Sequence, residues 1–448
     1  MTPKVLMLGW EFPPMINGGL GIACLGMAKA LRQHVDLTII LPRTDPSFQV
    51  NEVDLVGLNH LEEREVEAVK RFEGWDTVEK IIHVPVALDP YGDAASHQLS
   101  EEEIRRAEAG RSEVDCWMES TGLNLFQGRG ALYDSDVNAR VVAFARAAVA
   151  IARERDFDII HAHDWMTFLA GMEIKRQLKK PLVLHIHSLS YDRAGEEARG
   201  WVYDIERQAM YEADRVIPVS RYTGHICRDH YGVPEEKIFA VHNGAEAVEA
   251  FRSKKPFPGK LVLFLGRLTG QKGPRFFLEI AAKVLEQTRD VRFVMAGTGD
   301  KLRELIEYGA FRDVGDRLHF TGFLNRDEVN HLLSMTDVYC MPSVSEPFGL
   351  SALEAAQFEI PAVISRQSGA SEVLTEARKA DYWDVDLMAK HIVELISDDQ
   401  LHKEAVAASR QDQENCTWER AAERILPVYQ SCLPCDFGLA SSPSVAHA

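Results

Sequence analysis

The sequence predicts an α/β fold in two domains, each built around a parallel β-sheet, and three observations support this prediction. The chain has 448 residues, more than one ordinary domain, and 46% of them are hydrophobic, which is enough for two cores. Short runs rich in Val, Ile and Leu alternate with helical patterns, as expected of strands covered by helices on both faces. The alternation stops in a stretch containing Lys and Pro at 251–260 and then restarts. We therefore expect the two domains to join near residue 255.

The first domain is predicted to span 1–250 and the second 258–415. In the first domain we expect strands in the runs KVLMLGW, DLTIILP, KIIHVPVAL, DIIHAH, PLVLHIHS, RVIPVS and KIFAVHN. Between about 49 and 132 the pattern is less regular, and we predict an insertion of helices and loops over the first sheet. In the second domain we expect strands in KLVLFLGRL, VRFVMAG, RLHFTGF, DVYCMPS and PAVISR. Residues 416–432 predict a helix, and 433–448 are small and polar, which predicts a disordered tail.

Composition restricts the possible partners and compartment. The formal charge is −18, which argues against non-specific nucleic-acid binding and against a polybasic membrane anchor. We find no run of eighteen apolar residues and no cleavage site after the first apolar run, so we expect no integral membrane segment. Seven cysteines, an odd number in a large chain, favour reduced thiols. We therefore expect a cytoplasmic protein.

A glycine-rich turn follows the first predicted strand and opens a helical pattern that runs to about Leu31. Gly18 and Gly19 would allow backbone N–H groups to approach a phosphate at the start of that helix. A dinucleotide site would instead need the GxGxxG spacing, but Cys24 occupies its last glycine position. We therefore place a nucleotide-sugar site ahead of an NAD site.

The run HAHDW closes a predicted strand, so the side chains of His161 and His163 should share one face. His163, at the strand end, is our candidate for contact with a sugar. His185 and His187 on the next strand could complete a zinc site, which makes a metal-dependent hydrolase the main rival. Structural, hydrogen-bonding histidines are the plainer interpretation of His161 and His185.

Two further motifs fall at helix starts in the second domain. GRLTGQKG offers Arg267 as a bidentate ligand and Lys272 as a point charge for a diphosphate, although exposed loop cations are the simpler alternative. SEPFGLSALE places Glu346 before a predicted helix and Glu354 inside it, with Gly349 and Leu350 at the junction. Such carboxylates can accept hydrogen bonds from sugar or ribose hydroxyls, while the helix N–H groups face phosphate. A helix-start glutamate that stabilises the dipole is the alternative.

The order of WEFPP…GGLG, HAHDW, GRLTGQKG, AGTGD and SEPFGLSALEA resembles the retaining glycosyltransferases with two Rossmann-like domains, the GT-B fold. The chain resembles glycogen and starch synthases and the related large family four over roughly 1–48 and 130–432. The resemblance implies two domains facing across a cleft, with the donor bound mainly by the second domain and the acceptor by the first. It also implies a final helix that returns to the first domain, and no metal.

Carried over to this sequence, the resemblance assigns roles to individual residues. Arg267 and Lys272 match the diphosphate-binding pair, Glu346 the glutamate beside the donor sugar, Glu354 the ribose ligand, and His163 the histidine near the sugar 6-hydroxyl. We predict donor contacts also at Gly18, Gly19, Gly349, Leu350 and Gly369, and acceptor-side roles for Asp136 and His187. Asp136 is otherwise explained as the N-cap of a following helix.

Two motifs depart from the glycogen synthase pattern. INGGL at 16–20 replaces Lys-Thr-Gly-Gly-Leu, and QSGASE at 367–372 replaces a Thr-Gly-Gly-Leu phosphate loop and looks like family four. We keep a backbone phosphate cradle at Gly369 to Ser371 as a prediction. The expected activity is transfer of a hexosyl group, glucosyl in particular, from a donor such as ADP- or UDP-glucose to a carbohydrate, without a cofactor. The alternatives are another hexose with a non-glucan acceptor, the hydrolase, or a non-catalytic nucleotide-sugar sensor.

Overall fold

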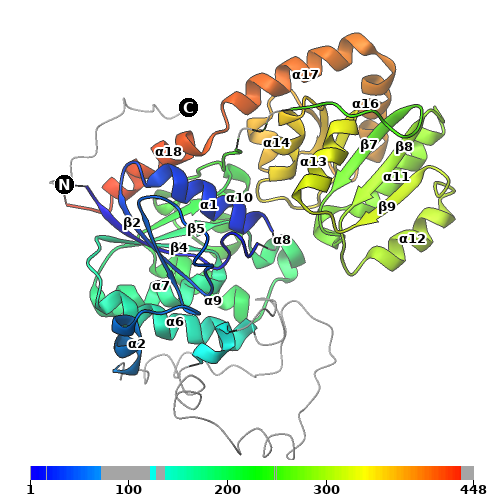
Figure 1. Ribbon diagram of the computed structural model, residues 1–448. Helices are drawn as coiled ribbons and strands as arrows, with labels where there is room; N and C mark the ends of the chain where they lie inside the picture. The colour runs from blue at the N-terminus through cyan, green and yellow to red at the C-terminus, as the bar shows by residue number, and fades with distance from the viewer. Residues whose placement is uncertain are drawn as a thin grey trace, which may run out of the picture.

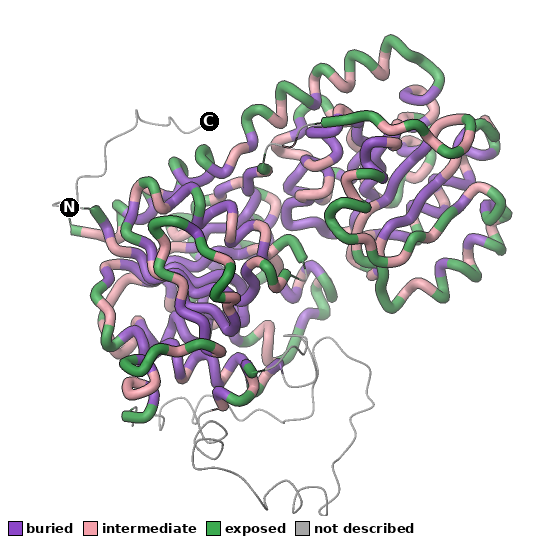
Figure 2. The backbone as a smooth tube through the Cα atoms, in the orientation of Figure 1, coloured by how far each residue is buried: buried purple, intermediate pink, exposed green. Residues whose placement is uncertain are grey.

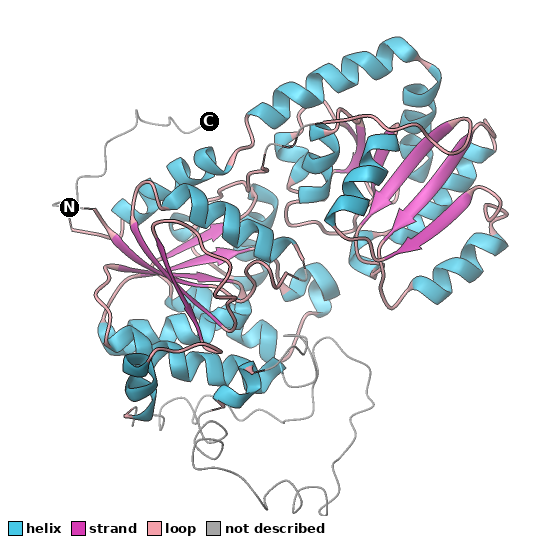
Figure 3. Cartoon of the chain, viewed as in Figure 1, coloured by secondary structure: helices cyan, strands magenta, loops and turns pink. Residues whose placement is uncertain are grey.

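The computed structural model describes residues 2–16, 18–71, 122–127, 137–246, 248 and 250–434. These residues form two six-stranded sheets with helices on both faces of each (Figures 1 and 3). The strand orders are β3-β2-β1-β4-β5-β6 and β12-β11-β10-β7-β8-β9, and each hydrogen-bonded pair is parallel. Both sheets follow the doubly wound order, in which strands are added first on one side of the first strand and then on its other side. The predicted fold class is confirmed.

The first sheet is built from residues 4–218. Its strands are β1 (Lys4–Leu8), β2 (Asp36–Leu41), β3 (Val53–Gly57), β4 (Ile159–His163), β5 (Leu182–Ile186) and β6 (Arg215–Pro218). Its helices are α1 (Gly19–Leu31), α2 (Glu63–Lys70), α6 (Val137–Arg153), α7 (Trp165–Leu178), α8 (Ser190–Ala194), α9 (Trp201–Glu212) and α10 (Arg221–Tyr231). Short 3-10 turns are η1 (Leu123–Phe126), η2 (Gly195–Glu197) and η3 (Glu235–Lys237).

The second sheet is built from residues 260–380. Its strands are β7 (Lys260–Leu265), β8 (Val291–Ala296), β9 (Leu318–Gly322), β10 (Val338–Met341), β11 (Ala362–Ser365) and β12 (Arg378–Ala380). The helices are α11 (Pro274–Leu285), α12 (Leu302–Phe311), α13 (Arg326–Met335), α14 (Leu350–Gln357), α15 (Ala370–Val373), α16 (Val385–Ser397), α17 (Asp399–Glu414) and α18 (Trp418–Gln430). One 3-10 turn, η4 (Gly270–Lys272), precedes α11.

Each sheet has a core on both faces because successive side chains of a strand point in opposite directions. On β1, Leu6 and Leu8 belong to the core that includes α6 and α7. Val5 and Met7 belong to the core that includes α1 and α18. All strands except β3, β9 and β12 are accordingly buried along most of their length (Figure 2). This double burial explains why the strands are continuous apolar runs.

The last described helix, α18, packs on the first domain. In Figure 1, α17 and α18 run from the second domain back to the first, where α18 lies beside α1. A Cβ atom on Gly26 of α1 would lie 2.2 Å from the Trp418 ring, so only glycine leaves room for this side chain. Tyr429, further along α18, is fully buried in the same core. The first domain therefore contains a core element taken from the end of the chain.

Two details of the predicted first sheet were wrong. The region from 49 contributes β3, an edge strand, and α2, so this part belongs to the sheet. The run KIFAVHN is extended but is not a regular strand. Its amides at Phe239 and Val241 donate to the carbonyls of Val216 and Pro218 at 2.9 and 3.0 Å. Pro218 has no N–H to return a bond, which explains why the ladder stops.

The predicted strand at 80–88 and the tail beyond 434 lie outside the described residues. Among the residues that the structure describes, no helix combines the length and the apolar character needed to span a bilayer.

Candidate active site

The loop between β10 and α14 carries Glu346, whose side chain is nearly buried. Its backbone is fixed to the loop that precedes α15: Glu346 N–H donates to the carbonyl of Gln367 at 2.9 Å, and Gly369 N–H donates to the carbonyl of Glu346 at 3.0 Å. The carboxylate accepts hydrogen bonds from the Lys272 ammonium at 2.8 and 2.6 Å and from the Ser343 hydroxyl at 3.2 Å. The structure thus joins Lys272 and Glu346, which the sequence analysis placed in separate motifs.

The two cations predicted to bind a diphosphate occupy different environments. Lys272, in η4, is 23% exposed and forms the ion pair with Glu346. Arg267 is exposed, and no other described residue pairs with it. The loop that carries both is held against the Glu346 loop, because a Cβ on Gly273 would lie 2.0 Å from the Pro342 carbonyl. Arg267 and the third N–H of Lys272 therefore remain available to an anion.

The start of α14 meets the start of α1, which belongs to the first domain. A Cβ on Gly19 would lie 3.3 Å from Leu350 Cδ1. Gly349 has φ 101, a backbone conformation that favours glycine, and a Cβ there would lie 3.0 Å from Met341 Cε. Gly18 and Gly19 are exposed, and Gly18 N–H donates to the Glu11 carboxylate at 3.2 Å. Four of the predicted donor-binding residues, Gly18, Gly19, Gly349 and Leu350, thus lie at one junction between the domains.

The predicted phosphate cradle at Gly369 to Ser371 is not available in this structure. The three amides donate to the carbonyls of Glu346, Phe348 and Ser368, so none points to an open position. A Cβ on Gly369 would lie 2.4 Å from the Pro347 carbonyl. Gly369 therefore permits a close contact between two loops, and this packing is enough to require glycine.

Glu354 lies on α14, with a side chain that is 16% exposed and paired with Arg326 at the start of α13. The sequence analysis did not identify Arg326. The role of Glu354 as a ribose ligand stays a prediction, and any such ligand would share this carboxylate with Arg326.

Four imidazoles cluster at the ends of β4 and β5. The His161 and His163 rings are 4.3 Å apart between centroids, as the alternation along the strand predicted. His163 Nδ1 lies 3.0 Å from His187 Nε2, and His161 Nε2 lies 3.3 Å from His185 Nδ1. Burial lowers the pKa of both His161 and His187 to about 3. Burial also lowers the pKa of His163 and His185, so the four rings are neutral near pH 7.

Most of the nitrogens of the four imidazoles are hydrogen bonded. His161, His163 and His185 each offer a nitrogen within 4.8 Å of the other two, which is the geometry that the hydrolase rival requires. Both nitrogens of His161 are occupied, however, because Nδ1 lies 2.7 Å from the Tyr429 hydroxyl and Nε2 contacts His185. A three-histidine metal site would have to break one of these bonds. Within the described chain, His163 Nε2 and His185 Nε2 are both fully buried without a hydrogen-bond partner.

Asp164 orders the ends of β4 and β5. Its carboxylate accepts the N–H groups of His187 and Ser188 at 2.8 and 3.1 Å. Asp164 has φ 59, which is unusual for a residue other than glycine. Burial raises its pKa to about 7. The pattern HAHDW contains Asp164, but the sequence alone gives no sign that it holds His187 beside His163.

The remaining predicted acceptor-side residue, Asp136, lies outside the described residues. The other, His187, is in the imidazole cluster. Sequence reasoning also missed the contacts that Asp192 and Tyr222 of the first domain make to Ser345, beside Glu346.

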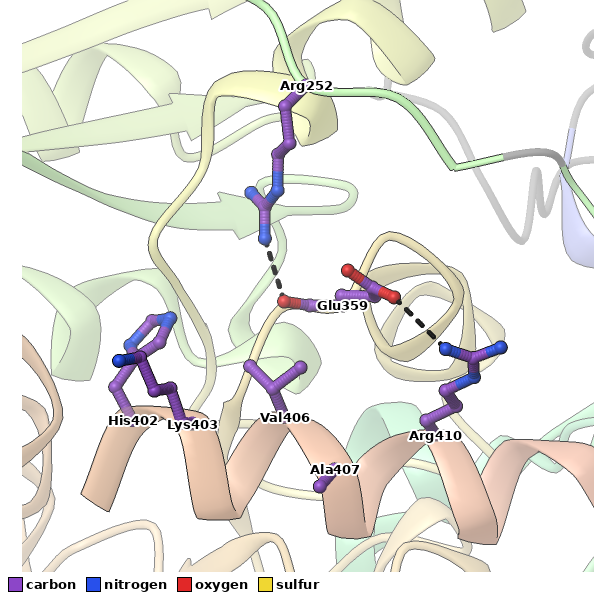
Figure 4. Close-up of a pocket in the computed structure, with 7 residues that line it drawn as sticks. All are labelled: Arg252, Glu359, His402, Lys403, Val406, Ala407 and Arg410. Atoms are coloured by element: carbon purple, nitrogen blue, oxygen red, sulfur yellow. Dashed lines mark hydrogen bonds and ion pairs between the residues drawn. The ribbon is translucent and has the colours of Figure 1, made fainter. Parts of the chain in front are cut away.

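A separate hollow of about 440 Å³ lies between α17 and the segment that links the domains (Figure 4). Arg252 and Arg410 approach it, but both are engaged. Arg252 donates to the carbonyls of Thr336 and Glu359 at 2.8 Å each, and Arg410 pairs with the Glu359 carboxylate at 3.5 Å. These bonds satisfy carbonyls at the ends of α13 and α14. None of the residues that line the hollow is a predicted site residue, and we interpret it as a packing space between α17 and the segment that links the domains.

Two family models match the chain, one in each of its two domains. Residues 4–240 match the family model for the starch synthase catalytic domain, and 247–412 match the model for glycosyl transferases group 1. An uncharacterized glycosyltransferase of Methanocaldococcus jannaschii is 26% identical over 460 residues, covering 95% of this chain and 98% of the relative. Glycogen synthase of Mycobacterium tuberculosis is 24% identical over 387 residues, covering 83% and 80%.

Solved structures share the fold at lower identity. Sucrose-phosphate synthase from Thermosynechococcus elongatus superposes with a TM-score of 0.66 at 17% identity, covering 96% of this chain and 98% of that one. Anabaena HepE, solved in complex with UDP and glucose, has a TM-score of 0.62 at 17% identity, covering 96% and 100%.

Proposed function

Because the chain belongs to the GT-B glycosyltransferases, with a starch synthase catalytic domain followed by a group 1 domain, we propose that it is a retaining hexosyltransferase. It transfers a glucosyl group from a nucleoside-diphosphate sugar, ADP- or UDP-glucose, to a sugar or glucan acceptor. The glycogen synthase relative supports the glucan acceptor, and the HepE complex with UDP and glucose supports the donor class. The observation that carries the proposal is the Lys272–Glu346 pair beside the start of α14.

In the proposed mechanism, cations and backbone amides stabilise the leaving diphosphate. The Arg267 guanidinium binds phosphate oxygens bidentately, and the third N–H of Lys272 donates to another. The free N–H groups in the first turn of α14 add their partial positive charge. This arrangement replaces the charge that a metal ion would supply, so no metal is required.

Glu346 supports the sugar as positive charge develops at its anomeric carbon. The bond from that carbon to the phosphate oxygen breaks, and the acceptor oxygen forms the new bond on the same face. The leaving phosphate takes the proton of the acceptor hydroxyl. Because the acceptor attacks the face from which the phosphate leaves, the α configuration is kept. His163 donates or accepts a hydrogen bond through Nε2 at a sugar hydroxyl, and Glu354 binds the ribose.

The test incubates the purified protein with ADP-, UDP- and GDP-sugars and measures released nucleoside diphosphate, with and without glucans. We expect a glucose donor to be consumed, with an increase in rate when a glucan is added and an α linkage by NMR. Another hexose, or stimulation only by a non-glucan acceptor, would favour the alternative transferase. A β linkage, or a lack of turnover with every donor, would contradict the proposal.

A further inference from the structure

The loop that carries Glu346 is held from the other domain on both sides of this residue. On one side, the Ser345 hydroxyl donates to Asp192 Oδ1 at 2.6 Å and lies 3.0 Å from the Tyr222 hydroxyl. Asp192 belongs to α8, and Tyr222 to the first turn of α10. Asp192 and Ser345 are both buried, so water does not compete for this bond.

On the other side, the carbonyl of Pro347 accepts a hydrogen bond from the Ser220 hydroxyl at 2.6 Å and from the Thr223 hydroxyl at 3.3 Å. Ser220 is fully buried and is the N-cap of α10, since its hydroxyl also accepts the N–H of Thr223 at 3.0 Å. The start of α10 is therefore rigid where it meets the Glu346 loop.

A third contact fixes the neighbouring loop. The Glu372 carboxylate of α15 accepts the N–H groups of Arg221 and Tyr222 at 3.0 and 2.7 Å, and it lies 2.7 Å from His242 Nε2. The residues just before α15 in turn bond to the backbone of Glu346. The same turn of α10 thus holds both loops that determine where Glu346 lies.

We propose that Asp192, Ser220 and Tyr222 are positioning residues, which place Glu346 in its working geometry only while the two domains are in contact. The inference rests on the proposed role of Glu346 beside the donor sugar. Lys272 and Glu346 both belong to the second domain and can pair without the first. Besides the bonds of Glu346 to Gln367 and Gly369 within the second domain, the residues on either side of Glu346 are held by groups from the first domain, so domain contact and the geometry of the carboxylate are coupled.

This coupling would protect the nucleotide-sugar donor from hydrolysis. A displacement of about 1 Å at a catalytic group can lower a rate by about 10²-fold. Before the domains meet, Glu346 is displaced and the donor is slow to react with water. Once they meet, the carboxylate is in place for the transfer reaction.

The experiment compares Tyr222→Phe, Ser345→Ala and the double variant with wild type. Tyr203→Phe is the matched control, because the Tyr203 hydroxyl bonds to the His230 carbonyl within the first domain. For each protein we measure kcat, the Kd of UDP and of ADP, and amide hydrogen exchange over 343–349 in the free protein. Thermal melting checks that each variant folds.

We expect Tyr222→Phe to lower kcat by about threefold and Ser345→Ala by about tenfold, and the double variant by less than the product, since the two residues share one bond. The Kd values should stay within about twofold, and exchange over 343–349 should rise in each variant but not in the control. Unchanged exchange, unchanged kcat, or equal losses in Tyr203→Phe would overturn the inference. If the wild type turns over no donor, the proposed function fails, and the exchange data still decide whether the first domain holds this loop.

Discussion

Replacing Glu346 with glutamine removes one negative charge and keeps nearly the same side-chain shape. In the wild type, Lys272 Nζ lies 2.8 and 2.6 Å from the two Glu346 carboxylate oxygens. In the variant an NH2 group replaces one of these oxygens, so Lys272 loses one acceptor. The amide can still bond to the Ser343 hydroxyl. The remaining difference is electrostatic. It acts on the transition state, in which the donor sugar becomes oxocarbenium-like.

The expected decrease in kcat follows from the distance between the Glu346 carboxylate and the charge on the sugar, and from the dielectric constant of their surroundings. A full unit charge about 4 Å away contributes about 4 kcal/mol at an effective dielectric constant of about 20. The sugar carries only part of a charge, and Lys272 opposes some of the field, so we expect about 3 kcal/mol, or roughly a 10²-fold lower kcat. The donor Kd should change by less than about threefold, because the ground-state sugar is neutral.

Single-turnover rates and donor Kd values measure the two effects separately, with Tm as the control for folding. In this variant Lys272 has no counter-ion, so its ammonium attracts the donor diphosphate at least as strongly as in the wild type. This change should strengthen donor binding, not weaken it. A variant with normal kcat and weakened donor binding would refute the reasoning, because Glu346 would then act in the ground state.

Four further experiments test separate features of the chain. Lys272→Ala should lower turnover by one to several orders of magnitude with the fold intact, and near-normal steady-state kinetics would contradict its role at the diphosphate. Glu354→Gln should raise the donor Kd several-fold by calorimetry while kcat changes little, and a loss confined to kcat would count against a ribose contact. A chelator should leave activity unchanged, whereas inactivation reversed by zinc or manganese would support a metal site. Burial lowers the pKa of His161 to about 3. Between about pH 3 and pH 6.5 the folded chain therefore binds fewer protons at His161 than the unfolded chain does, so the free energy of unfolding decreases as the pH is lowered through this range. His161→Gln should reduce that slope by up to about 1.4 kcal/mol per pH unit in urea titrations near pH 4 to 6, and equal slopes would exclude this contribution.

The sequence predicted the central strands and the edge strands β6 and β9, but it missed the edge strands β3 and β12. Central parallel strands are buried on both faces, so runs such as KVLMLGW are apolar throughout. The edge strand β3 contains the exposed Asp54, and β12 consists of Arg378, Lys379 and Ala380. Such edges expose one face to water and lack a continuous apolar run.

At the site, the sequence indicated which residues to examine but not how they pair. Lys272 and Glu346 are 74 positions apart, and Asp192 and Ser345 are 153 apart. A single sequence contains no signal for such contacts, because local patterns describe only the element in which each residue lies. The phosphate cradle at Gly369 to Ser371 was likewise suggested by a local pattern, but in the structure the amides of Gly369 and Ala370 donate to the distant Glu346 loop and the amide of Ser371 donates to Ser368.

The return of α18 to the first domain has a consequence for synthesis of the chain. Helix α18 contributes Trp418 and Tyr429, among others, to a core whose other buried residues lie between Val5 and Val241. At about 5 to 20 residues per second, a ribosome takes on the order of ten seconds or more to move from β6 to α18. During this time the face of α1 that will receive Trp418 is uncovered on the nascent chain. The second domain can thus finish folding before the first, and the exposed face is a natural place for a chaperone to bind.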